Sequence, residues 1–236
     1  MNFSYDTKII AHLLSSLNIK NLSKKLAIAL AEKERVSYVH NTAALEGNPM
    51  TYPEVQTLLE GITVGGRKLS DEQQILNQNA SWSLLLDMIR NSKFNIDKET
   101  ICALQFEVAK EEAIEWGKFR TAEVNIGGTN HKPPKSNELD QVFSSGITKI
   151  KEIKHPLEKA LVIFLFGAIN QFFFDGNKRT ARLMMNGILL DNGYPILNIK
   201  AEDKLEFNRQ MIDFYDSSDA TNVLQYLINY YGRNLA

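Results

Sequence analysis

The sequence predicts an all-α protein, mainly a helical bundle, with one short β-hairpin. Apolar residues recur at helical spacing through most of the chain, and helix-start residues such as Asp6, Ser23 and Asp97 precede several of these patterns. The hairpin is predicted at residues 124–126, where Val-Asn-Ile alternates apolar and polar side chains before a Gly-Gly pair and a later Pro-Pro pair. This is the only stretch of the chain that predicts a pair of strands.

Composition describes an ordinary globular protein, since 44% of the 236 residues are hydrophobic and 23% are charged. The formal net charge of −1, without a long basic run, argues against a general nucleic-acid-binding protein but leaves room for a local anion site. The single cysteine, Cys102, excludes an internal disulfide and favours a reducing compartment. We expect Cys102 to be a buried structural thiol, because no histidine lies in its segment.

No signal peptide or membrane span is predicted, so the expected location is cytoplasmic. The most apolar stretch, residues 160–174, contains Asn170 and Gln171 and is shorter than the roughly 20 residues that a bilayer span requires. The N-terminal apolar residues are interrupted by His12 and lack a small-residue cleavage site. Because the sequence stops soon after its last predicted helix, we also expect no appended DNA-binding domain.

The first half of the chain predicts five helices. Two of them open on capping boxes, Thr-Tyr-Pro-Glu at residues 51–54 and Ser-Asp-Glu-Gln at residues 70–73. Between these two helices, residues 61–68 contain Gly65 and Gly66 and are expected to form a loop. The expected helices cover residues 6–17, 23–45, 51–60, 70–90 and 97–117.

After the predicted hairpin, helices resume at about residue 138. The segment that follows His155-Pro156 is apolar on every side, which is typical of a helix at the centre of a bundle. The next helix begins after Asp175-Gly176-Asn177 and ends near Gly193, a good residue for a helix C-terminus, with Pro195 preventing its resumption. Two more helices are expected over residues 202–215 and 220–231.

The turn at residues 171–182 carries the clearest chemical signal. Gly176 supplies a tight turn, and Lys178 and Arg179 stand in the first turn of the new helix. Cations are unfavourable there, because a helix N-terminus already carries partial positive charge. Free backbone N–H groups and basic side chains together predict an anion, and Asp175 beside them could hold a divalent metal. On these features alone, an ordinary turn with a capping Asp175 and solvated basic residues is equally well supported.

The same segment resembles the active-site motif of Fic (Fido) proteins, His-Pro-Phe-x-Asp/Glu-Gly-Asn-Gly/Lys-Arg-x-x-Arg. Two positions depart from it: Gln171 stands in place of the family's histidine, and Phe172 in place of proline. The family's target-docking hairpin, or flap, resembles residues 117–126 with Pro133-Pro134, and the resemblance runs from about residue 40 to the C-terminus. Seven positions of the twelve-residue segment match the motif: Phe173, Asp175, Gly176, Asn177, Lys178, Arg179 and Arg182.

This resemblance implies the Fic fold and an activity, the transfer of AMP from ATP to a hydroxyl group of a target protein. It implies an N-terminal helical region over residues 1–95 and a Fic core domain over residues 96–236. Expected partners are ATP or ADP and a target protein, with neither nucleic acid nor membrane, while a homo-oligomer stays open. The catalytic positions would be Gln171, Asp175, Asn177 and Arg179, and the target protein would dock on Val124, Asn125 and Ile126.

In the implied nucleotide site, Asp175 would hold Mg²⁺, Asn177 and Arg179 the phosphates, and Arg182 the γ-phosphate. The remaining implied nucleotide-binding residues are Gly176 and Lys178 at the phosphates and Asn208, Met211 and Tyr215 around the adenine. For the apolar members of the adenine group, ordinary helix packing together with Phe207 and Phe214 is at least as well supported.

Residues 42–47, Thr-Ala-Ala-Leu-Glu-Gly, resemble the family's inhibitory pattern Ser/Thr-x-x-x-Glu-Gly/Asn. The resemblance implies that Glu46 pairs with Arg182 and so blocks the productive position of the ATP γ-phosphate. The implied competition is physically sound, because a carboxylate and a phosphate would share one guanidinium group.

Gln171 leaves the activity open. A carboxamide cannot accept the hydroxyl proton at neutral pH, and loss of a general base costs about 10²–10⁴-fold in rate. Three hypotheses follow: an active or weakly active transferase, a nucleotide-binding pseudoenzyme acting through protein partners, and, less favoured, removal of AMP or transfer of another phosphate-containing group. None of the four histidines lies in the motif, and His131, in the predicted flap, is the one to test as a substitute base.

Overall fold

The computed structural model describes residues 1–19 and 21–234, so the last two residues of the predicted core domain lie outside it. Two consecutive helices form its centre, α8 (Pro156–Asn170) and α9 (Asn177–Asp191), which pack along each other. Every α8 residue from Ala160 to Asn170 is buried, as the apolar pattern predicted. The turn between α8 and α9 therefore starts and ends on two buried helices.

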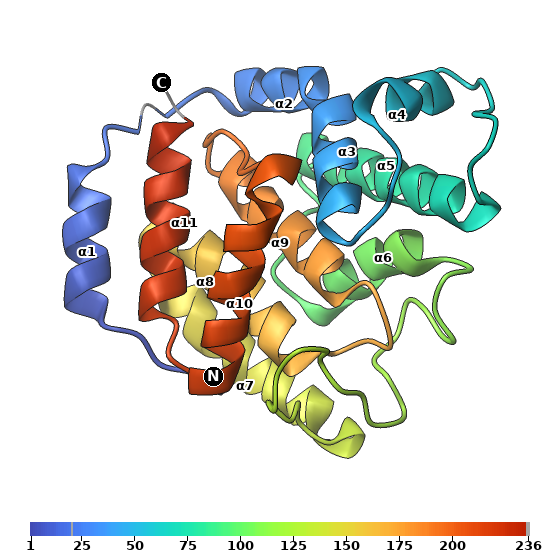
Figure 1. Ribbon diagram of the computed structural model, residues 1–236. Helices are drawn as coiled ribbons and strands as arrows, with labels where there is room; N and C mark the ends of the chain where they lie inside the picture. Colours follow the sequence, from blue (N-terminus) through green and yellow to red (C-terminus); the bar gives the residue numbers. More distant parts are fainter. Residues whose placement is uncertain (20, 235–236) are drawn as a thin grey trace.

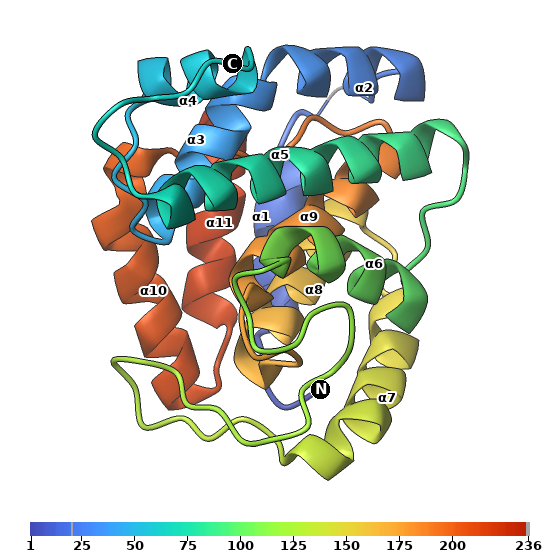
Figure 2. The ribbon, with the colours of Figure 1, turned by 90° about the vertical axis from the view of Figure 1, so that its right-hand side faces the viewer.

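Other helices surround this central pair (Figures 1 and 2). On one side α11 packs against α8 and is covered by α1 and α10, and on the other side α5 and α6 pack against α9 and against each other. A further helix, α7, packs against α8. These elements are α1 (Thr7–Ser16), α5 (Leu69–Arg90), α6 (Lys98–Ala109), α7 (Leu139–Glu152), α10 (Lys204–Ser217) and α11 (Thr221–Arg233), with short 3₁₀ turns at Ser136–Glu138 and Ala201–Asp203.

The helix predicted over residues 23–45 is two helices, α2 (Lys24–Lys33) and α3 (Arg35–Leu45), which meet at Glu34. Figure 1 shows α2 lying across one end of the molecule and α3 turned down alongside the rest. The bend lets α2 contact α9 while α3 packs on α5 and on α4 (Tyr52–Leu59), over a separate small core that includes Val39 and Val55. One straight helix could not cover both surfaces, and neither glycine nor proline marks the bend.

The helix caps at Asp6, Ser23 and Asp97 form as predicted, since each side chain accepts a backbone N–H hydrogen bond. The capping box at Thr51 is also present. Ser70, by contrast, lies inside α5, whose N-cap residue is Lys68. The C-terminal end of α6 was predicted wrongly: the helix stops at Ala109 instead of continuing to residues 116–117.

The predicted β-hairpin is absent, and no strand occurs within residues 1–19 and 21–234, where a single isolated bridge joins Ser4 to Asp219. Residues 121–135 form a loop whose arms share no backbone hydrogen bond in the described chain. Pro133 and Pro134 have no N–H group to donate to a strand ladder. Instead, the buried guanidinium of Arg120 donates to the carbonyl oxygens of Ala122 (2.8 Å) and Pro134 and so closes the loop at its base.

Cys102 is half-buried on α6, less buried than predicted, and desolvation raises the pKa of its thiol to about 11. Among the described helices, none is both long enough and apolar enough to cross a bilayer.

Candidate active site

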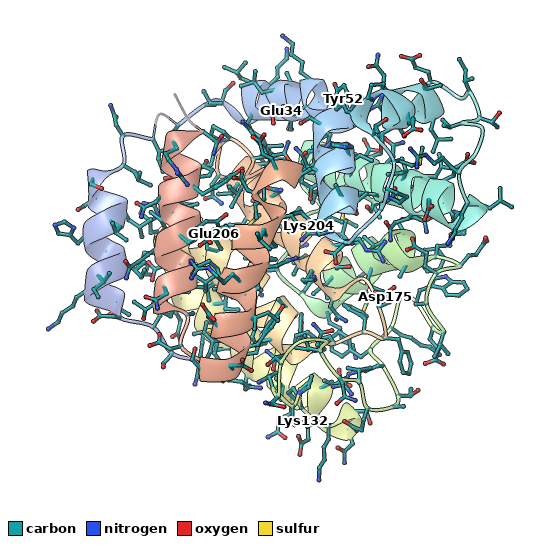
Figure 3. All side chains as sticks on the ribbon, in the orientation of Figure 1. Glu34, Tyr52, Lys132, Asp175, Lys204 and Glu206 are labelled. Carbon is teal, nitrogen blue, oxygen red and sulfur yellow. The ribbon has the colours of Figure 1, made fainter. Side chains whose placement is uncertain are left out.

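A cavity of about 540 Å³ opens at the turn between α8 and α9, where the end of α3, the middle of α10 and the loop at residues 125–127 converge. Figure 3 shows Asp175 on this turn and Lys132 on the neighbouring loop. The structure thus brings together segments that are far apart in the sequence. The lining residues are Glu46, Gln74, Asn125, Ile126, Gly127, Gln171, Phe174, Asp175, Gly176, Asn177, Lys178, Arg179, Asn208, Met211, Ile212 and Tyr215.

Gly176 allows the turn to form. Its φ of 76° lies in the left-handed region, and an added Cβ would lie 2.8 Å from Cγ1 of Val108. This position therefore requires glycine for two reasons, the positive φ and the close approach of Val108 to the backbone. The first backbone N–H groups of α9 have no partner within the helix, so this helix end can receive an anion.

Gln171 ends α8 in the left-handed conformation, with φ of 47° and ψ of 61°. Its Nε2 donates to the carbonyl oxygen of Ala168 (2.7 Å), and its Oε1 accepts from Nδ2 of Asn177 (3.0 Å). Both polar ends of the carboxamide are therefore engaged. Asn177 also caps the turn from within, because its Oδ1 accepts from the N–H of Phe173 at 2.9 Å and its Nδ2 donates to the carbonyl of the same residue at 2.8 Å.

Asp175 presents a carboxylate to the cavity, and 57% of its side chain is exposed. One oxygen accepts from the N–H of Gly176 (2.5 Å), and the other lies 3.4 Å from Nη2 of Arg179. Within the described residues no group of three His, Cys, Asp or Glu side chains could hold a metal by itself. A single exposed carboxylate fits Mg²⁺, which keeps several waters and is commonly bound by one or two carboxylates together with substrate phosphates.

Arg179 lies on the buried side of the cavity, with a side chain only 3% exposed. Its Nη1 donates to the carbonyl oxygen of Val108 (3.1 Å) and to both carboxylate oxygens of Glu112 (2.9 and 3.2 Å). Glu112 comes from the irregular segment that follows α6. The early end of α6 therefore brings an acidic residue to the α8–α9 turn.

Glu46, at the end of α3, reaches the same cavity. One of its carboxylate oxygens accepts from Nη2 of Arg182 (2.7 Å), and the other lies 3.1 Å from Nζ of Lys178. Burial by itself would raise the pKa of Glu46, but the charges of Arg182 and Lys178 outweigh burial and hold that pKa at about 2. The carboxylate is therefore ionised at neutral pH, in contact with two of the three basic residues of α9.

The opposite wall comes from α10, where Asn208, Met211 and Tyr215 line the cavity. Met211 and Tyr215 are also buried in the core, so helix packing and cavity lining both apply to them. The hydroxyl group of Tyr215 is buried and finds no hydrogen-bond partner among the described residues. Burial, and after it the charge of Glu46, raises the pKa of this hydroxyl group.

Three expected residues lie outside the cavity lining. Arg182 is buried behind Glu46, and Val124 lies beside the lining segment 125–127. His131 stacks on Tyr215, with 6.4 Å between ring centroids, and its Nε2 lies 3.1 Å from the carbonyl oxygen of Ile169. That contact makes Nε2 the donor and leaves only Nδ1 as a proton acceptor.

Sequence reasoning did not assign a role to three polar residues at the site: Arg120, Glu112 and Gln74. Arg120, only 2% exposed, donates from Nε to the carbonyl oxygen of Gln171 (2.7 Å) as well as to the loop base. Its place in the flap-like segment offered a signal. For Glu112 and Gln74 the sequence offered none, because both were predicted to be ordinary helix residues.

Residues 95–189 match the sequence profile of the Fic/DOC family. Curated relatives include two proteins called Protein adenylyltransferase Fic. The one from Aedes aegypti is 28% identical over 201 residues, which cover 82% of this chain and 39% of the relative. The one from Nematostella vectensis is 26% identical over 200 residues, which cover 82% of this chain and 46% of the relative. The chain thus spans less than half the length of these relatives.

Solved Fic structures share the fold. Fic-1 from C. elegans superposes with a TM-score of 0.77 at 19% identity and covers 97% of this chain and 69% of that one. A Fic-domain-containing signaling protein from Bacteroides thetaiotaomicron superposes with a TM-score of 0.72 at 22% identity and covers 96% of this chain and 90% of that one. IbpAFic2, in a complex with adenylylated Cdc42, gives a TM-score of 0.61 at 16% identity and covers 97% of this chain and 70% of that one. The chain therefore has the Fic fold, and its residues 95–189 match the Fic/DOC family profile.

Proposed function

We propose that this protein binds ATP or ADP with Mg²⁺ in the cavity at the α8–α9 turn and is related in activity to protein adenylyltransferases. In this proposal Glu46 inhibits it, and Gln171 impairs AMP transfer. The observation that carries the proposal is the position of the Glu46 carboxylate, which contacts Arg182 at 2.7 Å and Lys178 at 3.1 Å. A carboxylate held by two cations near a helix N-terminus supports an anion site there.

The other residues of the cavity supply what a nucleotide needs. Asp175 would hold Mg²⁺, which when bound neutralises charge on the phosphates. Arg179, Lys178 and the N-terminus of α9 would bind the phosphate oxygens. The adenine would lie against Met211 and Tyr215 on α10, where apolar side chains offer a stacking surface.

Inhibition by Glu46 follows from competition for one guanidinium group. A γ-phosphate bound by Arg182 would have to displace the carboxylate, while the α- and β-phosphates could bind at Arg179 without doing so. The inhibited protein is therefore expected to bind ADP more tightly than it binds ATP in the productive position. Release of α3 from this position would free Arg182.

Gln171 determines how much chemistry remains. Its amide orients Asn177 but has no lone pair of suitable basicity, so the hydroxyl proton of a target protein would have no acceptor at this position. Stabilisation of the phosphoryl group by the surrounding cations does not depend on Gln171. We therefore expect slow AMP transfer.

The alternative function is a catalytically inactive, nucleotide-binding regulatory module, favoured by the hydrogen bonds that occupy both ends of the Gln171 amide. Under either function the loop that carries Val124, Asn125 and Ile126 would receive a protein partner. The IbpAFic2 complex with Cdc42 shows that a Fic protein can bind such a partner.

Calorimetric titration with ATP and ADP in the presence of Mg²⁺ tests the proposal. Glu46→Gly should bind ATP at least about tenfold more tightly than the unmodified protein, because Arg182 becomes available. Glu111→Gly, which removes an exposed carboxylate from a position with φ of 63°, is the matched control and should behave like the unmodified protein. Failure of Glu46→Gly to bind either nucleotide would sink the proposed function.

A further inference from the structure

We propose that Glu112 is a positioning residue for the phosphate loop: it fixes the guanidinium of Arg179 in the orientation that receives the nucleotide's diphosphate. This inference rests on the proposed function. It concerns a residue outside the sequence motif, brought to the site by the early end of α6. The backbone at Glu111 turns through φ of 63° directly before it.

The contacts place Glu112 behind Arg179. Nη1 of Arg179 is held by the carboxylate of Glu112, at 2.9 and 3.2 Å, and by the carbonyl oxygen of Val108, at 3.1 Å. Nη2 lies on the side of Asp175, 3.4 Å from Oδ2. Arg179 and Asp175 line the cavity, whereas Glu112 does not. One end of the guanidinium is therefore anchored in the protein, and the other end is directed toward the place of the ligand.

Glu112 is itself held in place by two side-chain amides of α5. Nδ2 of Asn77 donates to Oε1 of Glu112 (2.8 Å) and to the carbonyl oxygen of Lys110 (2.7 Å), and Nε2 of Gln74 donates to Oε2 of Glu112 (3.3 Å). The carboxylate is only 13% exposed, so it is well shielded from solvent. A fixed carboxylate restricts the rotamers of Arg179 before a ligand arrives, and such preorganisation raises affinity.

The position of Glu112 distinguishes it from Glu46. Glu46 lines the cavity and contacts cations on the ligand side, so its removal should strengthen nucleotide binding. Glu112 contacts its cation from the protein side, and its removal should weaken binding. The two acidic residues therefore act with opposite sign on the same ligand, which makes the role of Glu112 measurable.

The test compares ADP and adenosine binding in the Glu46→Gly background, by calorimetry for ADP and ligand-observed NMR for adenosine. Glu112→Gln preserves shape and removes charge, and Glu112→Ala removes the anchor. Both should lose about tenfold in ADP affinity, the effect of a charge-assisted hydrogen bond, with adenosine affinity unchanged. Glu111→Gln, the same chemical change at the exposed neighbouring residue, should leave both affinities as they were.

Three results would overturn the inference. Tighter ADP binding in Glu112→Gln would make Glu112 a competitor of the phosphate. Equal losses for ADP and adenosine would show a general structural role. Equal ADP affinity in Glu112→Gln and Glu111→Gln would show that Arg179 needs no anchor. These results leave nucleotide binding itself intact, whereas absence of ADP binding in Glu46→Gly alone would overturn the proposed function and this inference with it.

Discussion

Nδ2 of Asn177 donates a hydrogen bond to Oε1 of Gln171 across 3.0 Å, joining the first residue of α9 to the last residue before the turn. Gln171 also donates to the carbonyl of Ala168, so its amide is oriented from both ends. The glutamine is thus a well-packed part of the turn. The amide satisfies the hydrogen bonds of the turn without offering a group that could accept a proton at neutral pH.

We predict that Gln171→His increases AMP incorporation from labelled ATP. Histidine tolerates the left-handed backbone at this position better than most residues, and its imidazole can accept the hydroxyl proton. In the Glu46→Gly background the expected increase is about 10²–10⁴-fold, the usual contribution of a general base. Auto-modification measured on a gel, for Gln171→His, Glu46→Gly, the double variant and the unmodified protein, provides the readout.

Robust labelling by Glu46→Gly alone would contradict this account of Gln171. In that event, His131 in the neighbouring loop is the first residue to replace, by asparagine. If the double variant binds ATP but is not labelled, the missing general base alone does not explain the absence of AMP transfer.

The ion pair of Glu46 should persist across the physiological pH range. Because its folded-state pKa of about 2 lies below that of an ordinary glutamate, the pair contributes stability above about pH 4.5 and loses it as pH falls toward 2. Glu46→Gln should lower the free energy of unfolding at pH 7 by about 3 kcal/mol, since it leaves the buried Arg182 unpaired.

Urea unfolding of the unmodified protein and Glu46→Gln between pH 2 and pH 8 measures this difference. The difference should be constant from pH 5 to pH 8 and shrink below that range, while Glu111→Gln, at an exposed position, should leave the free energy of unfolding at pH 7 nearly unchanged. A difference that instead shrank between pH 6 and pH 8 would indicate a titrating partner other than this carboxylate.

Gly176→Ala should destabilise the protein more than Gly66→Ala. Both glycines have a left-handed φ, 76° and 79°, so both variants incur the strain of a side chain there, about 1–2 kcal/mol. Only at Gly176 would the new Cβ also meet a neighbour, Cγ1 of Val108 at 2.8 Å, whereas nothing lies within 4 Å at Gly66. Melting temperatures of the two variants provide the comparison, and equal values would show that the turn relaxes around the methyl group.

The tip of the loop at residues 121–135 should be released by Asp216→Asn. The Asp216 carboxylate accepts hydrogen bonds from Oγ1 of Thr129 and, at 3.3 Å, from the N–H of Asn130. The loss of charge should raise amide hydrogen exchange across the loop by up to about tenfold, with little change in global stability, because the contacts are exposed. Asp213→Asn, an exposed change one turn earlier on α10, is the control, and equal exchange in both variants would exclude an anchoring role for Asp216.

The local placement of the α8–α9 turn could be predicted from the sequence. Gly176, Asn177 and Arg179 lie close together in the chain, so their spacing alone brings them to one turn, and the apolar residues of α8 place that turn at the bundle centre. Caps such as Asp97 were equally local. These features depend on neighbours in the chain.

Features that depend on tertiary contacts were not readable. The bend at Glu34 serves two separate packing surfaces, and α6 ends at Ala109 where Glu112 meets Arg179. The hairpin prediction failed for a related reason. Alternation at residues 124–126 is typical of a strand, but a strand needs a partner able to donate hydrogen bonds, and the Pro133-Pro134 arm lacks two of those donors.

Arg120 has a mechanical consequence. The same guanidinium donates to the carbonyl oxygens of Ala122 and Pro134, at the two ends of the loop, and to the carbonyl oxygen of Gln171, in the α8–α9 turn. Displacement of either end of this loop would therefore strain the backbone at residue 171. Binding of a protein at the loop and binding of a nucleotide at the turn would therefore affect each other through the guanidinium of Arg120. The coupling free energy would be the same in both directions.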